Sequence, residues 1–321
     1  MGKKKIKHLG RRSRKNKIKQ FIQIFMVLII IFVLSLGVRY IKNMFVARSI
    51  ENSKVEFYMD VADEVGNGEA QLNWKELLSI DMFIYNNDLS NVKKSDVIHR
   101  ANKFIDKHKD KNGNTVYYVK DIDEVLDELK IKSSDKGKIN NYLSQLENVY
   151  LGNKKLNNDS FQIKFINKIK KRAIKNYEEF GVLPSITIAQ CILESGWGNS
   201  ELSTKGKNLF GIKADSSWKG KSIELQTSEN YDDKIIAAFR VYPSIEESIR
   251  DHGLFLRNNP RYEKNGLFNS KTYIYQAQAL EDAGYSTKKD ENGKKIYADM
   301  LINLIREYNL QLIDWSLHNK K

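Results

Sequence analysis

Hydrophobic residues recur along residues 50–158 with the spacing of short amphipathic helices. Three segments place apolar residues close to every 3.6 positions: 72–83, 94–108 and 121–130. An Asn112-Gly113 pair precedes a β-prone run, which predicts a turn and a short strand. The pattern predicts a helical domain that assembles no chemistry, and we interpret it as a spacer or docking domain whose protein partners are unknown.

A polar stretch at residues 151–159 interrupts this pattern and predicts a domain boundary. The next segment, 160–181, is basic and amphipathic. We interpret it as the first helix of a second domain, residues 159–315, rather than as a helix on a membrane surface. Its apolar side consists of Phe161, Ile163, Phe165, Ile166 and Ile169.

Residues 184–195 are apolar on most sides, which is typical of a buried helix. Ser185 is a capping-type residue at its start, and Gly196 is suited to end it because the residue after a helix often has a positive φ. Glu194 is therefore expected in the last turn, where burial and the helix dipole both raise the pKa of a carboxyl group. A carboxyl group with a raised pKa keeps its proton near neutral pH, and a general acid donates that proton to the leaving glycosidic oxygen. The alternative is a structural Glu that is paired with a Lys or with backbone amides.

Two β-prone runs, 221–230 and 234–242, flank a turn at residues 231–233 and predict a β-hairpin. By strand alternation, Glu229 shares a face with Ile223, and the hairpin could carry it over a cleft. Three helices are expected after the hairpin: from a capping box at Ser244 and Glu247 to about 257, then about 271–282 and about 296–308.

Residues 21–38 form an uncharged, mostly apolar run, just long enough to cross a hydrocarbon core as a helix. Ten Lys and Arg and no Asp or Glu lie in residues 1–20, which places this basic tail in the cytoplasm. No small-residue cleavage site follows the run, which favours an uncleaved signal-anchor over a signal peptide. We predict a single-pass protein of the cell membrane, with everything from about residue 50 onward extracellular.

The formal net charge of +14 belongs mostly to the N-terminal tail. Setting the ten cations of residues 1–20 aside from +14 leaves +4 for residues 21–321, so no nucleic-acid partner is expected. The single cysteine, Cys191, allows no internal disulfide and is expected to be buried. The five histidines are scattered and form no metal-binding motif. Abundant Lys, Asn and Ile with only three Pro are typical of a low-GC Gram-positive source.

A longer signature surrounds Glu194. The segment 189–213, AQCILESGWGNSELSTKGKNLFGIK, resembles the signature of the N-acetylglucosaminidases of glycoside hydrolase family 73, which includes peptidoglycan autolysins and the flagellar muramidase-like domain. The resemblance continues through 239–252 and 283–301 and covers residues 159–310, about half the chain. The E-S-G triplet alone also occurs in lytic transglycosylases and goose-type lysozymes, whereas the following Trp-Gly and N-L-F-G-I-K make the signature specific.

The resemblance implies a mainly α (α+β) protein. Its lysozyme-like catalytic domain has a small β-hairpin lobe and is preceded by the helical domain and one transmembrane helix. Glu194 matches the general acid, and Glu229 matches the family's second carboxylate, a base for a water molecule. Asp232 and Asp233 are less suited substitutes, and in a third possibility the substrate's own 2-acetamido group attacks. No metal or other cofactor is implied.

Other residues of the resemblance are candidates for substrate binding. Tyr285 matches a Tyr that lines the family's cleft near the acid, where it could hydrogen-bond the N-acetyl group, and Tyr297 is a similar candidate. Trp197 and Phe210 offer apolar faces for sugar rings, although Trp197 is equally suited to the core. Asn208 is expected to hydrogen-bond between the two lobes.

We therefore predict a membrane-anchored endo-β-N-acetylglucosaminidase that cleaves the β-1,4 bond between GlcNAc and MurNAc in peptidoglycan strands during cell-wall remodelling. The nearest alternative is a muramidase or lytic transglycosylase with the same fold. The alternative from another class is a non-catalytic glycan-binding or scaffold protein, against which the intact signature around Glu194 argues.

Overall fold

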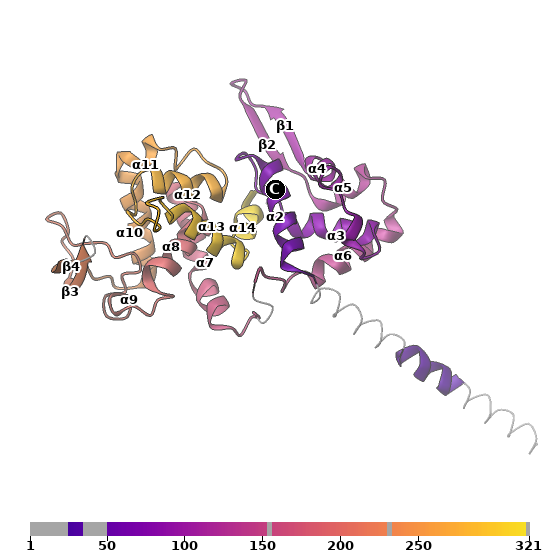
Figure 1. Ribbon diagram of the computed structural model, residues 1–321, viewed down its shortest axis with the longest axis horizontal. Helices are drawn as coiled ribbons and strands as arrows, with labels where there is room; N and C mark the ends of the chain where they lie inside the picture. Colours follow the sequence, from indigo (N-terminus) through magenta and orange to yellow (C-terminus); the bar gives the residue numbers. More distant parts are fainter. Residues whose placement is uncertain (1–24, 35–49, 153–155, 230–232, 319–321) are drawn as a thin grey trace, which may run out of the picture. The chain divides into compact units, whose positions relative to one another are not determined.

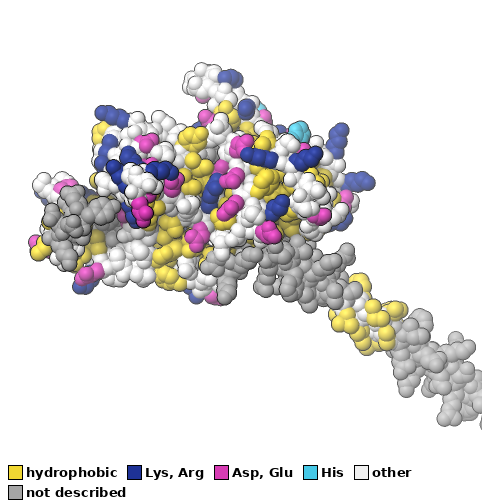
Figure 2. Space-filling view, viewed as in Figure 1, with side chains coloured by type: hydrophobic (Ala, Val, Ile, Leu, Met, Phe, Trp, Pro, Cys, Tyr) yellow, Lys and Arg dark blue, Asp and Glu magenta, His cyan; other side chains and the backbone are white. Residues whose placement is uncertain are grey.

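The computed structural model describes residues 25–34, 50–152, 156–229 and 233–318 and divides the chain into two units, residues 1–50 and 51–321. Residues 25–34 are helical, and their apolar side chains are exposed (Figure 2). The remainder of the predicted membrane segment, 21–24 and 35–38, lies outside the described residues, as does the basic tail. Within the described ranges, no helix has both the length and the apolar character needed to cross a membrane.

The first part of the second unit is helical with one small antiparallel sheet (Figure 1). Its elements are α2 (Asn52–Gly66), α3 (Trp74–Ile84), η1 (Leu89–Asn91), α4 (Lys94–Asn102), β1 (Ile105–Lys109), β2 (Thr115–Val119), α5 (Ile122–Glu128) and α6 (Ser133–Gln145). Residues 74–82 of α3 are all buried, so this helix is the centre of the local core.

The predicted helix over 94–108 is wrong in its second half. It ends at Asn102, and residues 105–109 instead form β1, which pairs with β2 in the register Ile105↔Val119. The turn at Gly113 (φ 82°) brings the two strands together, and this pairing overrides the local helical pattern.

The second part begins with α7 (Phe161–Phe180) and α8 (Pro184–Ser195). The elements that follow are α9 (Glu201–Gly206), β3 (Ser222–Glu229), β4 (Asp233–Arg240), α10 (Ile245–Asn258), α11 (Pro260–Lys264), α12 (Tyr273–Asp282), α13 (Tyr297–Glu307) and α14 (Gln311–His318). Residues 184–192 are buried without a break, which shows that α8 lies in the core. It packs there against α7, α12, α13 and α14. The mainly helical fold with small two-stranded sheets is confirmed.

The start of α8 differs from the expectation for Ser185. The helix begins at Pro184, so Ser185 lies inside the first turn and does not act as its cap. Its backbone N–H and its hydroxyl both donate to the buried carboxylate of Asp314 in α14. The backbone N–H of Ser185, which has no acceptor within its own helix, therefore finds one in α14.

Strands β3 and β4 form the predicted hairpin beside α9, with Ile223 opposite Phe239 and Glu229 opposite Asp233 (Figure 1). Ile223 and Leu225 are half-buried, whereas the alternate residues 222, 224 and 226 are exposed, as strand alternation requires. Asp233 begins β4 rather than lying in the turn, and residues 230–232 are outside the described ranges.

Polar contacts join the two parts of residues 51–321. Arg306 of α13 donates to Asp63 of α2 at 2.6 Å and pairs with Asp60 at 2.9 Å. The hydroxyl of Tyr273 in α12 also donates to Asp63 and accepts from Arg306 Nε at 3.0 Å. The proposed boundary at 151–159 remains a prediction.

Candidate active site

Glu194 is held at the end of α8 by an unusual run of backbone conformations. Gly196, Trp197 and Gly198 all have positive φ values of 56°, 62° and 76°. The N–H of Trp197 donates to Ile192 O at 3.1 Å, and the N–H of Gly198 donates to the hydroxyl of Ser195 at 2.7 Å. These bonds end the helix at Ser195, one residue after Glu194, as expected for a left-handed glycine cap.

Glu194 is an exposed residue, although its carboxyl group is largely surrounded by protein atoms. This burial is the main influence on the carboxyl group, and it raises the pKa because it disfavours the charged form. A hydrogen bond from the Tyr297 hydroxyl to Oε1 at 2.8 Å and the charge of Lys288 act in the opposite direction, and burial outweighs them. A carboxyl group with a raised pKa can both hold and deliver a proton.

Tyr297 and Tyr285 form an aromatic pair beside the acid. Their rings stack with centroids 5.3 Å apart, and the hydroxyl of Tyr297 accepts from Gln190 Nε2 at 3.1 Å. Burial and the charge of Glu194 raise the pKa of both phenols well above the ordinary value, so both remain protonated. The structure thus brings together Glu194, Tyr285 and Tyr297, three residues that the sequence singled out.

Phe210 reaches this cluster through a histidine. Its ring stacks on His252 with centroids 3.7 Å apart, and His252 Nε2 lies 3.2 Å from the Tyr285 hydroxyl. His252 was not among the residues selected from the sequence, because the histidines were considered there only as components of a metal-binding motif. The signal was present, because residues 248, 249, 252, 253 and 256 of α10 recur at helical spacing and are all buried.

Trp197 and Asn208 have mainly packing partners. Trp197 contacts Phe165 of α7 and Tyr308, with centroid distances of 5.9 Å and 5.0 Å, which favours the core interpretation. Asn208 is buried and donates to Ile212 O and Arg240 O, both at 2.9 Å. It thereby joins the loop after α9 to the end of β4.

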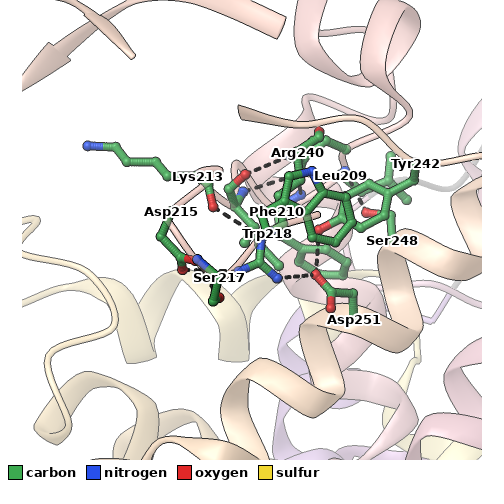
Figure 3. Close-up of polar contacts among 12 residues, drawn as sticks. Leu209, Phe210, Lys213, Asp215, Ser217, Trp218, Arg240, Tyr242, Ser248 and Asp251 are labelled. Atoms are coloured by element: carbon green, nitrogen blue, oxygen red, sulfur yellow. Dashed lines mark hydrogen bonds and ion pairs between the residues drawn. The ribbon is translucent and has the colours of Figure 1, made fainter. Parts of the chain in front are cut away.

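Arg240, at the end of β4, anchors the root of the hairpin (Figure 3). Its guanidinium donates to Asp251 of α10 at 2.8 Å and to Asp215 at 3.2 Å, and it lies 4.8 Å from the centre of the Trp218 ring. Its Nε also donates to Lys213 O at 3.1 Å. Residue 251 adjoins His252, so the hairpin is tied to the helix that carries this histidine.

The carboxylates proposed for the second catalytic role lie at the other end of the hairpin. The backbone of Glu229 closes β3 opposite Asp233, but the structure does not describe the side chains of residues 227–234. Asp232 lies outside the described ranges. The choice among Glu229, Asp233 and Asp232 therefore rests on the sequence.

Known proteins resemble the same part of the chain. The glucosaminidase family model, described as mannosyl-glycoprotein endo-beta-N-acetylglucosaminidase, matches residues 170–310. Exo-glucosaminidase LytG of Bacillus subtilis (strain 168) is 40% identical over 158 residues, 47% of this chain and 52% of LytG. A probable N-acetylmuramidase of Lactococcus lactis subsp. lactis (strain IL1403) is 37% identical over 159 residues, 47% of this chain and 34% of that protein.

A solved structure matches as well. The catalytic domain of the autolysin Auto from Listeria monocytogenes is 34% identical, with a TM-score of 0.42, over 49% of this chain and 90% of that domain. The chain spans about half or less of the length of the two curated relatives. Residues 170–310 belong to the glucosaminidase family, family 73 of the glycoside hydrolases.

Proposed function

We propose that this protein is a peptidoglycan hydrolase that cleaves the β-1,4 bond on the reducing side of GlcNAc, with Glu194 as general acid. The observation that carries the proposal is the setting of Glu194, an exposed residue whose carboxyl group is surrounded by protein atoms and accepts a hydrogen bond from Tyr297. Family membership adds the reaction class. The name of the Lactococcus protein, a probable N-acetylmuramidase, supports a MurNAc-containing substrate, whereas LytG is named as an exo-glucosaminidase, so the two names differ on the bond.

In the proposed reaction, Glu194 donates its proton to the glycosidic oxygen as the bond to the anomeric carbon breaks. A water molecule attacks the anomeric carbon, and a base accepts the proton that this water loses. The acid ends ionised and the base protonated, and exchange with solvent restores both. We propose Glu229 as the base because it matches the family position and because the hairpin can bring it to the far side of the sugar.

The test of the acid uses reducing-end analysis, by mass spectrometry, of sugars that the full-length chain releases from purified peptidoglycan. Glu194→Gln should lower the rate by at least about 100-fold, since general acid catalysis contributes about 10²–10⁴-fold. Glu201→Gln is the matched control, because Glu201 is an exposed residue of α9 whose side chain pairs with Lys205 at 2.7 Å. Equal activity of the two variants would contradict the role of Glu194.

The same products decide the bond. Reducing-end GlcNAc supports the glucosaminidase proposal, reducing-end MurNAc a muramidase, and 1,6-anhydroMurNAc a lytic transglycosylase. If neither the wild-type protein nor any variant released sugars, the result would support the scaffold alternative. Release of short fragments from strand ends or of internal fragments separates exo- from endo-cleavage.

The role of Glu229 is tested by comparison with a second glutamate of the same strand, Glu224. Glu229→Gln should lower the rate by about 100-fold, whereas Glu224→Gln should leave it within a few-fold, because Glu224 is exposed on the opposite face of β3. An unaffected Glu229→Gln variant would contradict an enzyme base at this position and favour attack by the 2-acetamido group or transglycosylation.

We also propose that residues 21–38 anchor the protein in the cell membrane, with the catalytic domain outside the cell. The uncharged run and the ten cations before it support this orientation. Fractionation of cells should find the chain in the membrane fraction, with residues 51–321 digestible from outside. A soluble chain in this experiment would contradict the anchor without affecting the proposed reaction.

A further inference from the structure

His252 is a fully buried histidine in the middle of the described site. It has no exposed surface, and burial lowers its pKa to about 3, so its imidazole is neutral at physiological pH. The parallel stack on Phe210, with an interplanar angle of 2°, fixes the plane of its ring. A neutral imidazole in a fixed plane has one N–H donor and one acceptor nitrogen, and its two tautomers assign these roles differently.

The two ring nitrogens have unequal surroundings. Nε2 lies 3.2 Å from the hydroxyl oxygen of Tyr285. Nδ1 is buried and has no hydrogen-bond partner within the described part of the chain. If Nδ1 carried the proton, a buried N–H would have no acceptor, and orphaned N–H groups are rarer in folded proteins than acceptors with unused lone pairs.

We infer that His252 is a positioning residue whose Nε2–H donates to the oxygen of Tyr285, which leaves the Tyr285 hydroxyl hydrogen to donate to the substrate beside Glu194. This inference rests on the proposed function for its substrate. A hydroxyl that could rotate would donate to the histidine in some molecules and to the sugar in others. The donating Nε2–H removes the first choice, so the hydroxyl is pre-oriented before the sugar arrives.

The position of Tyr285 fits this role. Its ring stacks on Tyr297, whose own hydroxyl donates to Glu194 Oε1, and its phenol senses the charge of Glu194. A donor in this place can bond a carbonyl or hydroxyl oxygen of a sugar whose glycosidic bond is held at Glu194. The hydroxyl of Tyr297 already donates its hydrogen to Glu194, so Tyr285 is the member of the pair whose hydroxyl hydrogen can donate to the substrate.

The tautomer can be measured without any activity. In the full-length chain with ¹⁵N-labelled histidine, multiple-bond ¹H–¹⁵N correlation spectra distinguish a protonated from an unprotonated ring nitrogen. The signals of His252 are those missing in His252→Gln. We expect a protonated Nε2 and an unprotonated Nδ1 between about pH 5 and 8. A protonated Nδ1, or two protonated nitrogens, would overturn the inference even if the proposed reaction were correct.

Activity then tests the consequence with two amide variants. A Gln amide can reach the place of Nε2, whereas the shorter Asn amide reaches only the place of Nδ1. We expect His252→Gln to keep kcat/KM on peptidoglycan within about tenfold and His252→Asn to lose about 100-fold, the scale of a misplaced reacting group. In a Tyr285→Phe background the two variants should differ by less than about threefold, because the oriented hydroxyl is absent.

A merely structural histidine predicts a different result. Both amide variants would then lower Tm and kcat/KM together, and the losses would add to that of Tyr285→Phe instead of disappearing in its background. Equal losses in His252→Gln and His252→Asn would also overturn the inference. If the wild-type chain released no sugar at all, the proposed function would fail, and the tautomer measurement would still decide the hydrogen bond.

Discussion

Glu194 illustrates how two opposing contacts set the chemistry of one residue. Crowding by protein raises the pKa of its carboxyl group, and the hydrogen bond from Tyr297 lowers it because the bond favours the ionised form. A general acid must be protonated, so kcat/KM should fall as the pH rises through this pKa, which lies above the ordinary value for Glu of about 4.3.

Removal of the Tyr297 hydroxyl should therefore shift the basic limb of the pH profile. Tyr297→Phe removes the bond that favours the charged form, so the pKa of Glu194 should rise and the limb should move to higher pH. The measurement is kcat/KM against pH on purified peptidoglycan. Tyr308→Phe is the control, because Tyr308 packs on Trp197 instead. A limb that stays in place or moves to lower pH would contradict this account of Glu194.

Single residues were predictable where the signal is local. The place of Glu194 follows from the apolar run before it and the Gly196 after it, both within one helix. His252 was not found, since its partner Tyr285 is 33 positions away and comes from a different element. The hydrophobic period predicts that His252 lies on the buried face of its helix, but it does not predict that this face contacts the Tyr285 hydroxyl.

At the scale of elements, α8 depends on a helix that the sequence analysis did not predict. Asp314 of α14 accepts from Ser185 at the start of α8, and burial outweighs these bonds and raises the pKa of Asp314 to about 7. An Asp in an unfolded chain titrates near 3.9. Between about pH 4 and 7 the folded protein thus binds a proton that the unfolded chain does not, so the free energy of unfolding should fall as the pH rises across this window.

Asp314→Asn should remove this part of the pH dependence. Relative to wild type, the variant should gain stability from pH 4 to 7, by at most about 4 kcal/mol, because the amide carries no charge at either pH. Urea unfolding at several pH values measures the difference. Asp159→Asn, a change at an exposed carboxylate, should follow the wild-type curve. A constant difference between wild type and Asp314→Asn across the window would refute the buried proton.

Elements with a clear local pattern were predicted, among them the seven-residue α5 within 121–130, whereas α2 and α6 were not singled out although they have 15 and 13 residues. The amphipathic pattern of α7 and the capping box of α10 locate these helices. The helices α9, α11 and α14 have 6, 5 and 8 residues, too few to show a helical period, and they form because the surrounding core accepts them. Strand β1 was taken for helix because its partner β2 decides its conformation.

At the scale of the whole molecule, the region before the catalytic domain was interpreted as a spacer or docking segment. In the structure, α2 contributes Asp63 and Asp60 to Arg306 of α13, the helix whose first residue, Tyr297, bonds the acid. Contacts between residues more than 200 positions apart leave no trace in local hydrophobic patterns. We therefore expect residues 51–146 to add stability to the catalytic domain rather than only to extend its reach.

The two acidic partners of Arg306 allow a matched test. The side chain of Asp63 is 9% exposed and that of Asp60 is 57% exposed, although both lie within 3 Å of the guanidinium. Removing one partner of a largely buried ion pair costs about 3–5 kcal/mol, whereas an exposed pair contributes about 0–1 kcal/mol. In urea unfolding of the full-length chain, Asp63→Ala should lose about 3 kcal/mol and Asp60→Ala less than about 1 kcal/mol. If the first region were an independent spacer, Asp63→Ala would leave the unfolding of the catalytic domain unchanged, and the expectation would be wrong.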